Sequence, residues 1–481
     1  MASTKAPDVS SEIMDEALAK FAKASEDMKT LSKRAIELQN FQLKEFAEDK
    51  DAGEKELRDL TLDDLAFGLE LTPNYLRQLS SKHANNPNFP QGIRSTNGRR
   101  LYTIDDLQAM IRFLSKDEPL ESPKYRRMRI EAIGECVQVI NVATFKGGSG
   151  KTTTVKHLAQ HLALHGYRVL IIDLDAQASL TASEGKLPEH RYKVGGDFTK
   201  FMSQEPDDTG KIPTIAGAIE DTCWSNIKIL PANLGLHTWE NKESSRAVMR
   251  KDPASGVEVY ESVELESSDD KISPILRLRM GLQDPELTDQ FDIIILDTPP
   301  NLGLLSQNAI LAATALITPL APSMFDFASS GQFAALLSDI YKPTNMLPLM
   351  WEAAMYGMQI PDAPAFHKFL FTSTRSGANS ASFQGMIRVA LRREYMLENV
   401  ALESTAVRTA LDQKLSLYEA SPQGVHGVAR ETHRRALDSF NAVNDEILAL
   451  IRNEWARQRQ EFKDKQNGQQ VVLPIDSDVE V

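Results

Sequence analysis

The segment Thr144–Thr154, TFKGGSGKTTT, brings glycines, two lysines and several hydroxyl groups together. Glycines allow the backbone of residues 147–150 to wrap around oxygen atoms so that its N–H groups point inward. A helix that begins at Lys151 would direct its positive end at the same point. This spacing is typical of a P-loop, in which the lysine contacts the β- and γ-phosphates and the Thr152 hydroxyl binds Mg²⁺. We therefore predict nucleotide contacts from Lys146, Gly147, Gly148, Ser149, Gly150, Lys151, Thr152 and Thr153.

Two acidic strand ends fit the same site. The run LIIDLDAQAS places Asp173 and Asp175 at the C-terminal end of an expected strand, where α/β sheets gather their ligands. The run IIILDTPP places Asp297 after apolar residues, as a carboxylate beside the magnesium. Asp175, just beyond its strand, is the better candidate to orient an attacking water, and a solvated loop carboxylate is the alternative. Asp173 could equally contact the metal through water or be structural.

Apolar runs of the buried type alternate with helical patterns over residues 137–466. Apolar strands separated by helices indicate a doubly wound, mostly parallel α/β sheet, which here would form a P-loop ATPase domain. A charged stretch at residues 242–271 interrupts this order, and we expect a helix followed by a surface loop there. The expected strands are VQVINVAT, RVLIIDLD, DIIILDTPP, TALITPL and FHKFLFTST, and the helix after the P-loop is TTVKHLAQHLALHGY.

A long helix is expected within residues 1–50. Between Ser11 and Ala47, apolar residues recur at alternating spacings of three and four, which is a heptad pattern. The pattern favours a dimerisation helix, and a helix that packs on its own domain is the alternative.

Residues 51–118 have the spacing of a winged helix-turn-helix unit. A short helix at 62–68, a turn and a second helix opened by Pro73 are expected, and the dipeptide Asn97-Gly98 predicts a hairpin that would form the wing. The chain has no carboxylate between residues 72 and 103, where several arginines lie. Two helices that only pack together are the alternative. DNA contacts are predicted from Tyr75, Arg77, Gln78, Arg99 and Arg100.

The composition sets bounds on the class of protein. The formal net charge of −13 argues against nucleic acid as a partner, but a sum over the whole chain hides local basic clusters. One such cluster occupies residues 363–393, which contain no carboxylate; a solvated helix face is the alternative. A polar linker is expected at 119–136 and a flexible acidic tail at 467–481.

The location expected from the sequence is the cytoplasm. The N-terminus has no apolar h-region, and no run of about 18 apolar residues occurs, so neither a secretion signal nor a membrane span is expected. The only cysteines, Cys136 and Cys223, are isolated in the sequence. Their isolation fits a reducing compartment and argues against a disulfide framework or a zinc site.

Three segments, KGGSGKTTT, VLIIDLDAQASLT and IILDTPPNLG, resemble the ParA-type, deviant-Walker partition ATPases. The match is closer to one branch, the RepA partition proteins of RepABC plasmids, and it includes LSLYEAS and ALDSFNAVNDEILALI near the C-terminus. A helix-turn-helix ahead of the ATPase is expected in that branch. The family does not require glycine at the position of Phe145. Ala176 stands where the family usually has proline, a difference that would loosen the switch loop.

The resemblance implies an Mg²⁺-dependent ATPase that segregates a replicon. Lys146 would be the signature lysine, which crosses to the nucleotide of the partner subunit in an ATP-sandwiched homodimer. Lys146, Lys151 and Asp175 are then the catalytic candidates, and Thr152, Asp297 and Asp173 the metal candidates. The family also implies a nucleoid-associated protein with a ParB- or RepB-like centromere-binding partner. Its basic C-terminal surface would bind DNA without sequence preference through Arg375, Arg388 and Arg392.

Other functions are compatible with parts of this pattern. The winged helix would let the protein repress its own operon, and the alternative to a partition ATPase is a repressor whose nucleotide site only sets its dimerisation. Membrane-bound division-site ATPases share the loop but need a basic amphipathic C-terminal helix, and RNEWARQRQEFKDKQNGQQ is too polar for that. Nitrogenase-type reductases need cluster-ligating cysteines, and neither cysteine lies in a suitable pair.

Overall fold

The computed structural model describes residues 55–96, 98–118, 125, 127–186, 197–232, 234–251, 258–262, 272–358, 363–374, 378–421, 425 and 427–467. Several predictions fall outside the described residues: the dimerisation helix, Asn97 of the hairpin turn, residues 119–124 and 126 of the linker, Arg375, and the tail from residue 468. The chain divides into two compact units, Met1–Glu56 and Leu57–Val481, and every described helix and strand belongs to the second.

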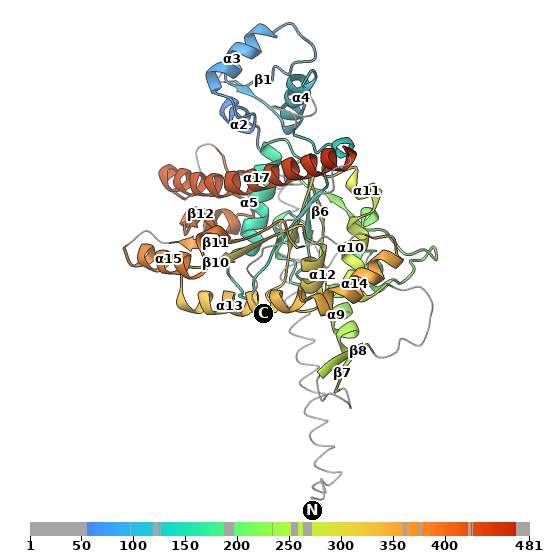
Figure 1. The fold of residues 1–481 in the computed structure, drawn as a ribbon. Coiled ribbons are helices and arrows are strands. Elements are labelled where there is room, and N and C mark those ends of the chain that lie inside the picture. Colours follow the sequence, from blue (N-terminus) through green and yellow to red (C-terminus); the bar gives the residue numbers. More distant parts are fainter. Residues whose placement is uncertain are drawn as a thin grey trace, which may run out of the picture. The chain divides into compact units, whose positions relative to one another are not determined.

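An eight-stranded sheet forms the centre of this second unit (Figure 1). The strand order is β12-β11-β10-β3-β9-β4-β6-β5, and all neighbouring pairs are parallel except β5 and β6. The predicted mostly parallel α/β sheet is therefore confirmed, and so are the five strands expected from apolar runs. The strands are β3 (Gln138–Val142), β4 (Val169–Asp173), β5 (Glu220–Asp221), β6 (Ile227–Leu230), β9 (Ile293–Asp297), β10 (Ala315–Leu320), β11 (Phe366–Thr374) and β12 (Met396–Leu402).

The central strands are buried along their whole length because helices cover both faces of the sheet. Every residue of β3, β4 and β9 is buried. Successive side chains of a strand point to opposite faces of the sheet, so neighbouring residues pack in different apolar clusters. Ile295 packs in a cluster with residues of α5 (Lys151–Leu164) and α17 (Arg430–Gln466), whereas Ile294 and Leu296 pack with α8 (Asp197–Ser203), α9 (Leu234–Arg246) and α12 (Leu304–Ala312).

Shorter elements connect or cover this core. They are α6 (Ser179–Ser183), α10 (Arg277–Leu282), α11 (Pro285–Thr288), α13 (Met324–Ile340), α14 (Pro343–Met355), α15 (Ala378–Ala390), α16 (Thr405–Asp412) and the 3-10 turns Glu131–Ile133, Ala216–Ala218, Pro274–Leu276 and Arg393–Tyr395. No helix among the described residues is both long enough and apolar enough to span a membrane.

The charged stretch at residues 242–271 differs from its prediction. The expected helix is present as the end of α9, but the loop prediction is wrong where β7 (Ala247–Lys251) pairs antiparallel with β8 (Glu258–Ser262). The cross-strand partner of Met249 is Tyr260. The alternating sequence VEVYESV carried the signal for a strand, and the high charge around it obscured that signal.

The first part of the second unit contains two helices, a hairpin and a third helix: α2 (Leu62–Gly68), α3 (Pro73–Lys82), β1 (Ile93–Arg94), β2 (Arg100–Leu101) and α4 (Ile104–Ser115). Side-chain caps fix the helix starts. The Thr61 hydroxyl accepts a hydrogen bond from the backbone N–H of Asp64, whose carboxylate accepts one from the Thr61 N–H. The Thr72 hydroxyl caps α3 by accepting a hydrogen bond from the backbone N–H of Tyr75 at 3.3 Å.

These helices pack directly on the large sheet domain. Leu65, Leu76 and Leu107 belong to the same apolar cluster as residues of α5 and α17. A Cβ atom on Gly68 would lie 1.9 Å from the Leu164 carbonyl oxygen, so only glycine permits this approach of α2 to α5. The Gln108 side chain also donates to the Gly166 carbonyl at 2.9 Å.

Candidate nucleotide site

The P-loop lies between the end of β3 and the start of α5. Gly148 and Gly150 have φ values of +73° and +90°, a region that favours glycine. The Thr372 hydroxyl of β11 donates to the Ser149 carbonyl at 2.8 Å and fixes the loop from the side. The Lys151 ammonium is mostly buried and donates to the Lys146 carbonyl at 3.3 Å. Burial lowers the pKa of Lys151, against the opposing effect of the Asp297 and Asp175 charges.

The sheet register brings the predicted acidic residues to the same place. Asp297 pairs with Val142 of β3 on one side and with Asp173 of β4 on the other. The Thr152 hydroxyl donates to Asp297 Oδ2 at 2.7 Å, while Asp297 Oδ1 is buried without a hydrogen-bond partner. Burial first, and then the neighbouring Asp173 charge, raise the pKa of Asp297 well above its ordinary value. A cation beside this oxygen would relieve both effects, so the residues present fit a bound Mg²⁺.

Asp173 has a different environment from Asp297. It is fully buried, and one carboxylate oxygen accepts hydrogen bonds from the Thr181 hydroxyl at 2.7 Å and the Thr181 N–H at 2.9 Å. The other oxygen accepts from the backbone N–H of Asp175 at 3.1 Å. Burial raises the pKa of Asp173 to about 7, and the Asp175 charge adds to this effect. Asp173 therefore fastens the segment that carries Asp175 to the end of β4.

Asp175 is half-buried just past the strand end. Its carboxylate accepts a hydrogen bond from the Gln177 N–H at 2.9 Å. Its charge acts on the Lys151 ammonium. Ala178, at the start of α6, adopts a left-handed φ of +55°, and its N–H bonds to the Asp175 carbonyl at 2.7 Å. The segment after β4 is thus a tight turn that holds Asp175 near the P-loop.

Lys146 has a partner that the sequence analysis missed. Its ammonium donates to Asp326 Oδ2 at 2.6 Å, and its side chain is 44% exposed whereas that of Asp326 is 5% exposed. Asp326 lies in the first turn of α13, where Ser323 is the N-cap. The pattern Ser323-x-x-Asp326 after the strand TALITPL was a cap signal available in the sequence. The Phe145 ring packs edge-on against the ring of Phe333 in α13, with 5.0 Å between the ring centroids. This contact explains why an aromatic residue occupies position 145.

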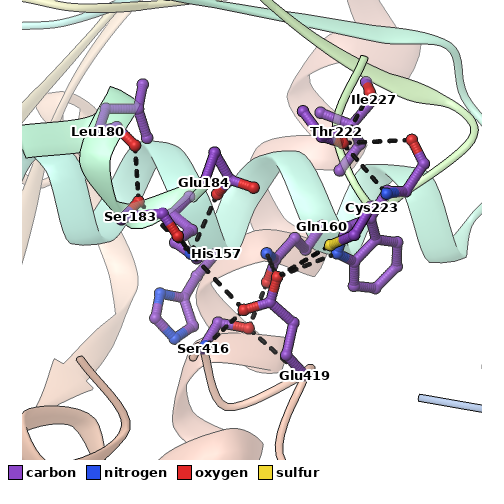
Figure 2. Close-up of polar contacts among 12 residues, drawn as sticks. His157, Gln160, Leu180, Ser183, Glu184, Thr222, Cys223, Ile227, Ser416 and Glu419 are labelled. Atoms are coloured by element: carbon purple, nitrogen blue, oxygen red, sulfur yellow. Dashed lines mark hydrogen bonds and ion pairs between the residues drawn. The ribbon is translucent and has the colours of Figure 1, made fainter. Parts of the chain in front are cut away.

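A buried polar network behind the P-loop holds α5 to the segment LSLYEAS (Figure 2). The Lys156 side chain is 1% exposed, and its Nζ lies 3.0 Å from Glu184 Oε1 and 3.5 Å from Glu419 Oε2. Glu419 Oε1 also accepts from Gln160 at 3.0 Å, and Glu419 Oε2 accepts from the Ser416 N–H at 2.7 Å. The C-terminal segment therefore supplies the buried charge that orients the P-loop helix.

The arginines of the basic cluster are not equivalent. Arg388 donates to the Leu397 and Glu398 carbonyls at 2.7 and 2.8 Å, so its side chain fastens α15 to β12. Arg392 has a 71% exposed side chain and pairs with Glu394 at 3.0 Å. The sequence did not indicate these hydrogen bonds, because the Arg388 guanidinium donates to backbone carbonyls of β12, a strand that the sequence analysis did not predict.

The predicted DNA-contacting residues of α3 lie on its outer side. Tyr75, Arg77 and Gln78 are exposed, whereas Leu76 and Ser80 are buried. Arg99 is exposed at the hairpin, and Arg100 is half-buried because it donates to the Gln91 side chain at 2.8 Å. The helix thus has one side in the core and one side available to a ligand.

Known proteins share both sequence and fold with this chain. The family model described as an AAA domain matches residues 137–347. A relative from Sinorhizobium fredii (strain NBRC 101917 / NGR234), named "Putative replication protein A", is 32% identical over 404 residues, 84% of this chain and 88% of the relative. Protein SopA of Escherichia coli (strain K12) is 32% identical over 328 residues, 66% of this chain and 72% of its own length. A solved structure titled "Partition Protein" covers 86% of this chain and 98% of its own, at 16% identity and a TM-score of 0.50. The chain belongs to the ParA-type partition ATPase family.

Proposed function

We propose that this protein hydrolyses Mg-ATP and uses the hydrolysis to segregate a replicon. The observation that carries the proposal is the convergence of Lys151, Thr152 and Asp297 at one sheet edge, with a buried Asp297 oxygen that has no hydrogen-bond partner. Thr152 and Asp297 would hold Mg²⁺, which neutralises charge on the β- and γ-phosphate oxygens. Lys151 would bind the same phosphates, and Asp175, held by Asp173, would orient the attacking water.

The proposed active form is an ATP-dependent homodimer, and an exposed apolar surface beside the P-loop supports it. Asp326, which holds Lys146, directly follows Met324 and Phe325 in α13, whose side chains are 60% and 84% exposed. Large apolar groups exposed together on a soluble protein mark an interaction surface. In the dimer, Lys146 would leave Asp326 and reach the nucleotide of the partner subunit.

Phe325→Asp is expected to prevent dimerisation while the monomer still binds ATP, because the substitution places a charge on the proposed contact surface. Lys146→Gln should give the same result, since it removes the cation that reaches across. Light scattering with a non-hydrolysable ATP analogue measures the mass, and Ile212→Asp, at a loop residue that is 46% exposed, is the matched control. Normal dimers of both Phe325→Asp and Lys146→Gln would refute the proposed contact surface.

The protein is also proposed to bind DNA in two ways. The exposed side of α3 would read an operator and so repress the operon of this protein, and the basic cluster around Arg392 would bind any duplex through phosphates. A centromere-binding protein of the ParB or RepB type is the proposed partner. The second candidate function, a nucleotide-regulated repressor without a partition role, rests on the same exposed residues Tyr75, Arg77 and Gln78. An operator footprint that does not depend on ATP, with no binding to random DNA, would favour this second function.

Arg77→Ala is expected to weaken operator binding by about 1–3 kcal/mol if the arginine contacts a base edge. It should change binding to random duplex little. Arg392→Ala should weaken binding to random duplex and change operator binding little. The slope of log K against log salt concentration on random DNA should become shallower by about 0.9, because a complex with one phosphate contact fewer releases fewer counterions when it forms. Salt titrations of both variants on both DNAs, with ATP and with ADP, measure these effects, and Arg112→Ala in α4 is the control. Equal losses on both DNAs for both variants would contradict the model with two separate surfaces.

A further inference from the structure

Two histidines and an aspartate converge where α5 ends against α17. His161 lies in the last turn of α5, His165 is the residue that caps the end of this helix, and Asp445 comes from α17. Each offers one ligand atom, and these atoms lie within 4.8 Å of one another. The two histidines are 0% and 2% exposed, whereas the Asp445 side chain is 54% exposed and opens the cluster to solvent. The sequence analysis argued against zinc from the cysteines alone and did not weigh this pair.

The hydrogen bonds determine which nitrogen of His161 carries its proton. The Tyr418 hydroxyl donates its only hydrogen to Asn441 Oδ1 at 2.8 Å. It must therefore accept a hydrogen bond from His161 Nδ1, which lies 3.2 Å away. Nδ1 of neutral His161 is then protonated, and its Nε2 presents a lone pair. That Nε2 is buried and has no hydrogen-bond partner, although Asp445 Oδ1 lies only 3.1 Å from it.

His165 is oriented in the same way. Its Nδ1 lies 2.9 Å from the His161 carbonyl oxygen, which can only accept, so the proton of the neutral ring is on Nδ1 and Nε2 is available. A metal-binding histidine typically donates its other ring nitrogen to a carbonyl or a similar acceptor. The ring of Phe67, in α2, packs edge-on against both histidine rings, with centroid distances of 5.5 Å to His161 and 5.0 Å to His165.

The cluster thus contains two nitrogen lone pairs and a carboxylate, and no cationic side chain from the described part of the chain lies between them. A second cluster on the same helix differs in this respect, because the Lys156 ammonium lies between Glu184 and Glu419. Arg452 is on the same helix as Asp445 but donates to Glu70 and to the Tyr167 hydroxyl, at 2.6 and 3.1 Å. A tetrahedral zinc ion with bonds of about 2.0–2.1 Å holds its ligand atoms about 3.3 Å apart, close to the separation of His161 Nε2 and Asp445 Oδ1.

We propose that His161, His165 and Asp445 bind a zinc-type divalent transition-metal ion. Two imidazoles and a carboxylate are a typical ligand set for zinc, with water as the fourth ligand. The ion would join the end of α5 to α17, beneath Phe67 of α2, at the opposite end of the helix from the P-loop. The site does not depend on the proposed ATPase function.

The test uses the full chain, freed of metal by a chelator and kept in excess Mg²⁺ so that the nucleotide site is occupied. Titration with Co²⁺, followed by visible absorption, should give the intense bands of a tetrahedral site with one ion bound per chain, and Zn²⁺ should displace them. Asp445→Asn, which alters an exposed side chain and preserves its shape, should weaken binding about 100-fold or more, because removal of a ligand costs at least as much as removal of its supporting group. His165→Gln should do the same.

A matched control and a second measurement keep the test decisive. His237→Gln, at an exposed histidine of α9, should bind Co²⁺ as the parent does. Zn²⁺ should raise the thermal unfolding midpoint of the parent but not of Asp445→Asn. If the parent binds no Co²⁺, or if Asp445→Asn and His165→Gln bind it as tightly as the parent, the three residues are not ligands. A proton shared by His161 and Asp445 would then occupy the cluster.

Discussion

Lys151→Ala should abolish ATP binding, with an affinity loss of at least about 100-fold. Lys151 is the only P-loop side chain whose ammonium is buried against the loop and next to Asp297 and Asp175, among the described residues. A charge-assisted contact to phosphate in such a site contributes more than an ordinary hydrogen bond. Isothermal titration with Mg-ATP measures the loss directly.

The folded state of this variant should be stable, which makes the result interpretable. Burial disfavours the Lys151 ammonium in the free protein and lowers its pKa, so its removal does not leave a stabilising ion pair broken. The unfolding midpoint should therefore stay near that of the parent. Lys211→Ala, at an exposed lysine outside the sheet, is the matched control. If Lys151→Ala binds Mg-ATP as tightly as the parent, the assignment of the P-loop is wrong.

The parts of the site that could be predicted from sequence are those fixed by local patterns. A P-loop, a strand before it and a helix after it lie in one continuous segment, and apolar runs place Asp173 and Asp297 at strand ends. Parallel strands then bring those ends to one edge of the sheet, as the register of β3, β9 and β4 does. The agreement follows because sheet geometry leaves few alternatives for residues at the ends of buried strands.

The parts that could not be predicted depend on contacts between distant segments. Lys146 and Asp326 are separated by 180 positions, and nothing near either residue indicates the other. Arg388 bonds to backbone carbonyls, which every residue has, so its sequence carries no sign of the contact. The hairpin of β7 and β8 was missed for a different reason, since its charged residues masked the alternation of Val259 with its neighbours.

Asp175→Ala should retain ATP binding and dimerisation but should lose most hydrolysis. Loss of a group that positions or accepts a proton from the attacking water lowers a rate by about 10²–10⁴-fold. The nucleotide contacts proposed for Lys151, Thr152 and Asp297 do not involve the Asp175 side chain. The variant should therefore accumulate in the ATP-bound dimer and remain on random DNA when ATP is supplied.

The measurement compares single-turnover ATP hydrolysis with residence on DNA in the same preparation. Asp175→Ala should show slow turnover together with prolonged DNA binding, a combination that Lys151→Ala cannot show because it does not hold ATP. Asp175→Asn tests the charge separately from the shape, and Asp208→Ala, at an exposed turn, is the control. Asp173 holds the Asp175 backbone through its N–H, so removal of the Asp175 side chain should leave the turn itself in place. Parental turnover in Asp175→Ala would therefore show that another group orients the water.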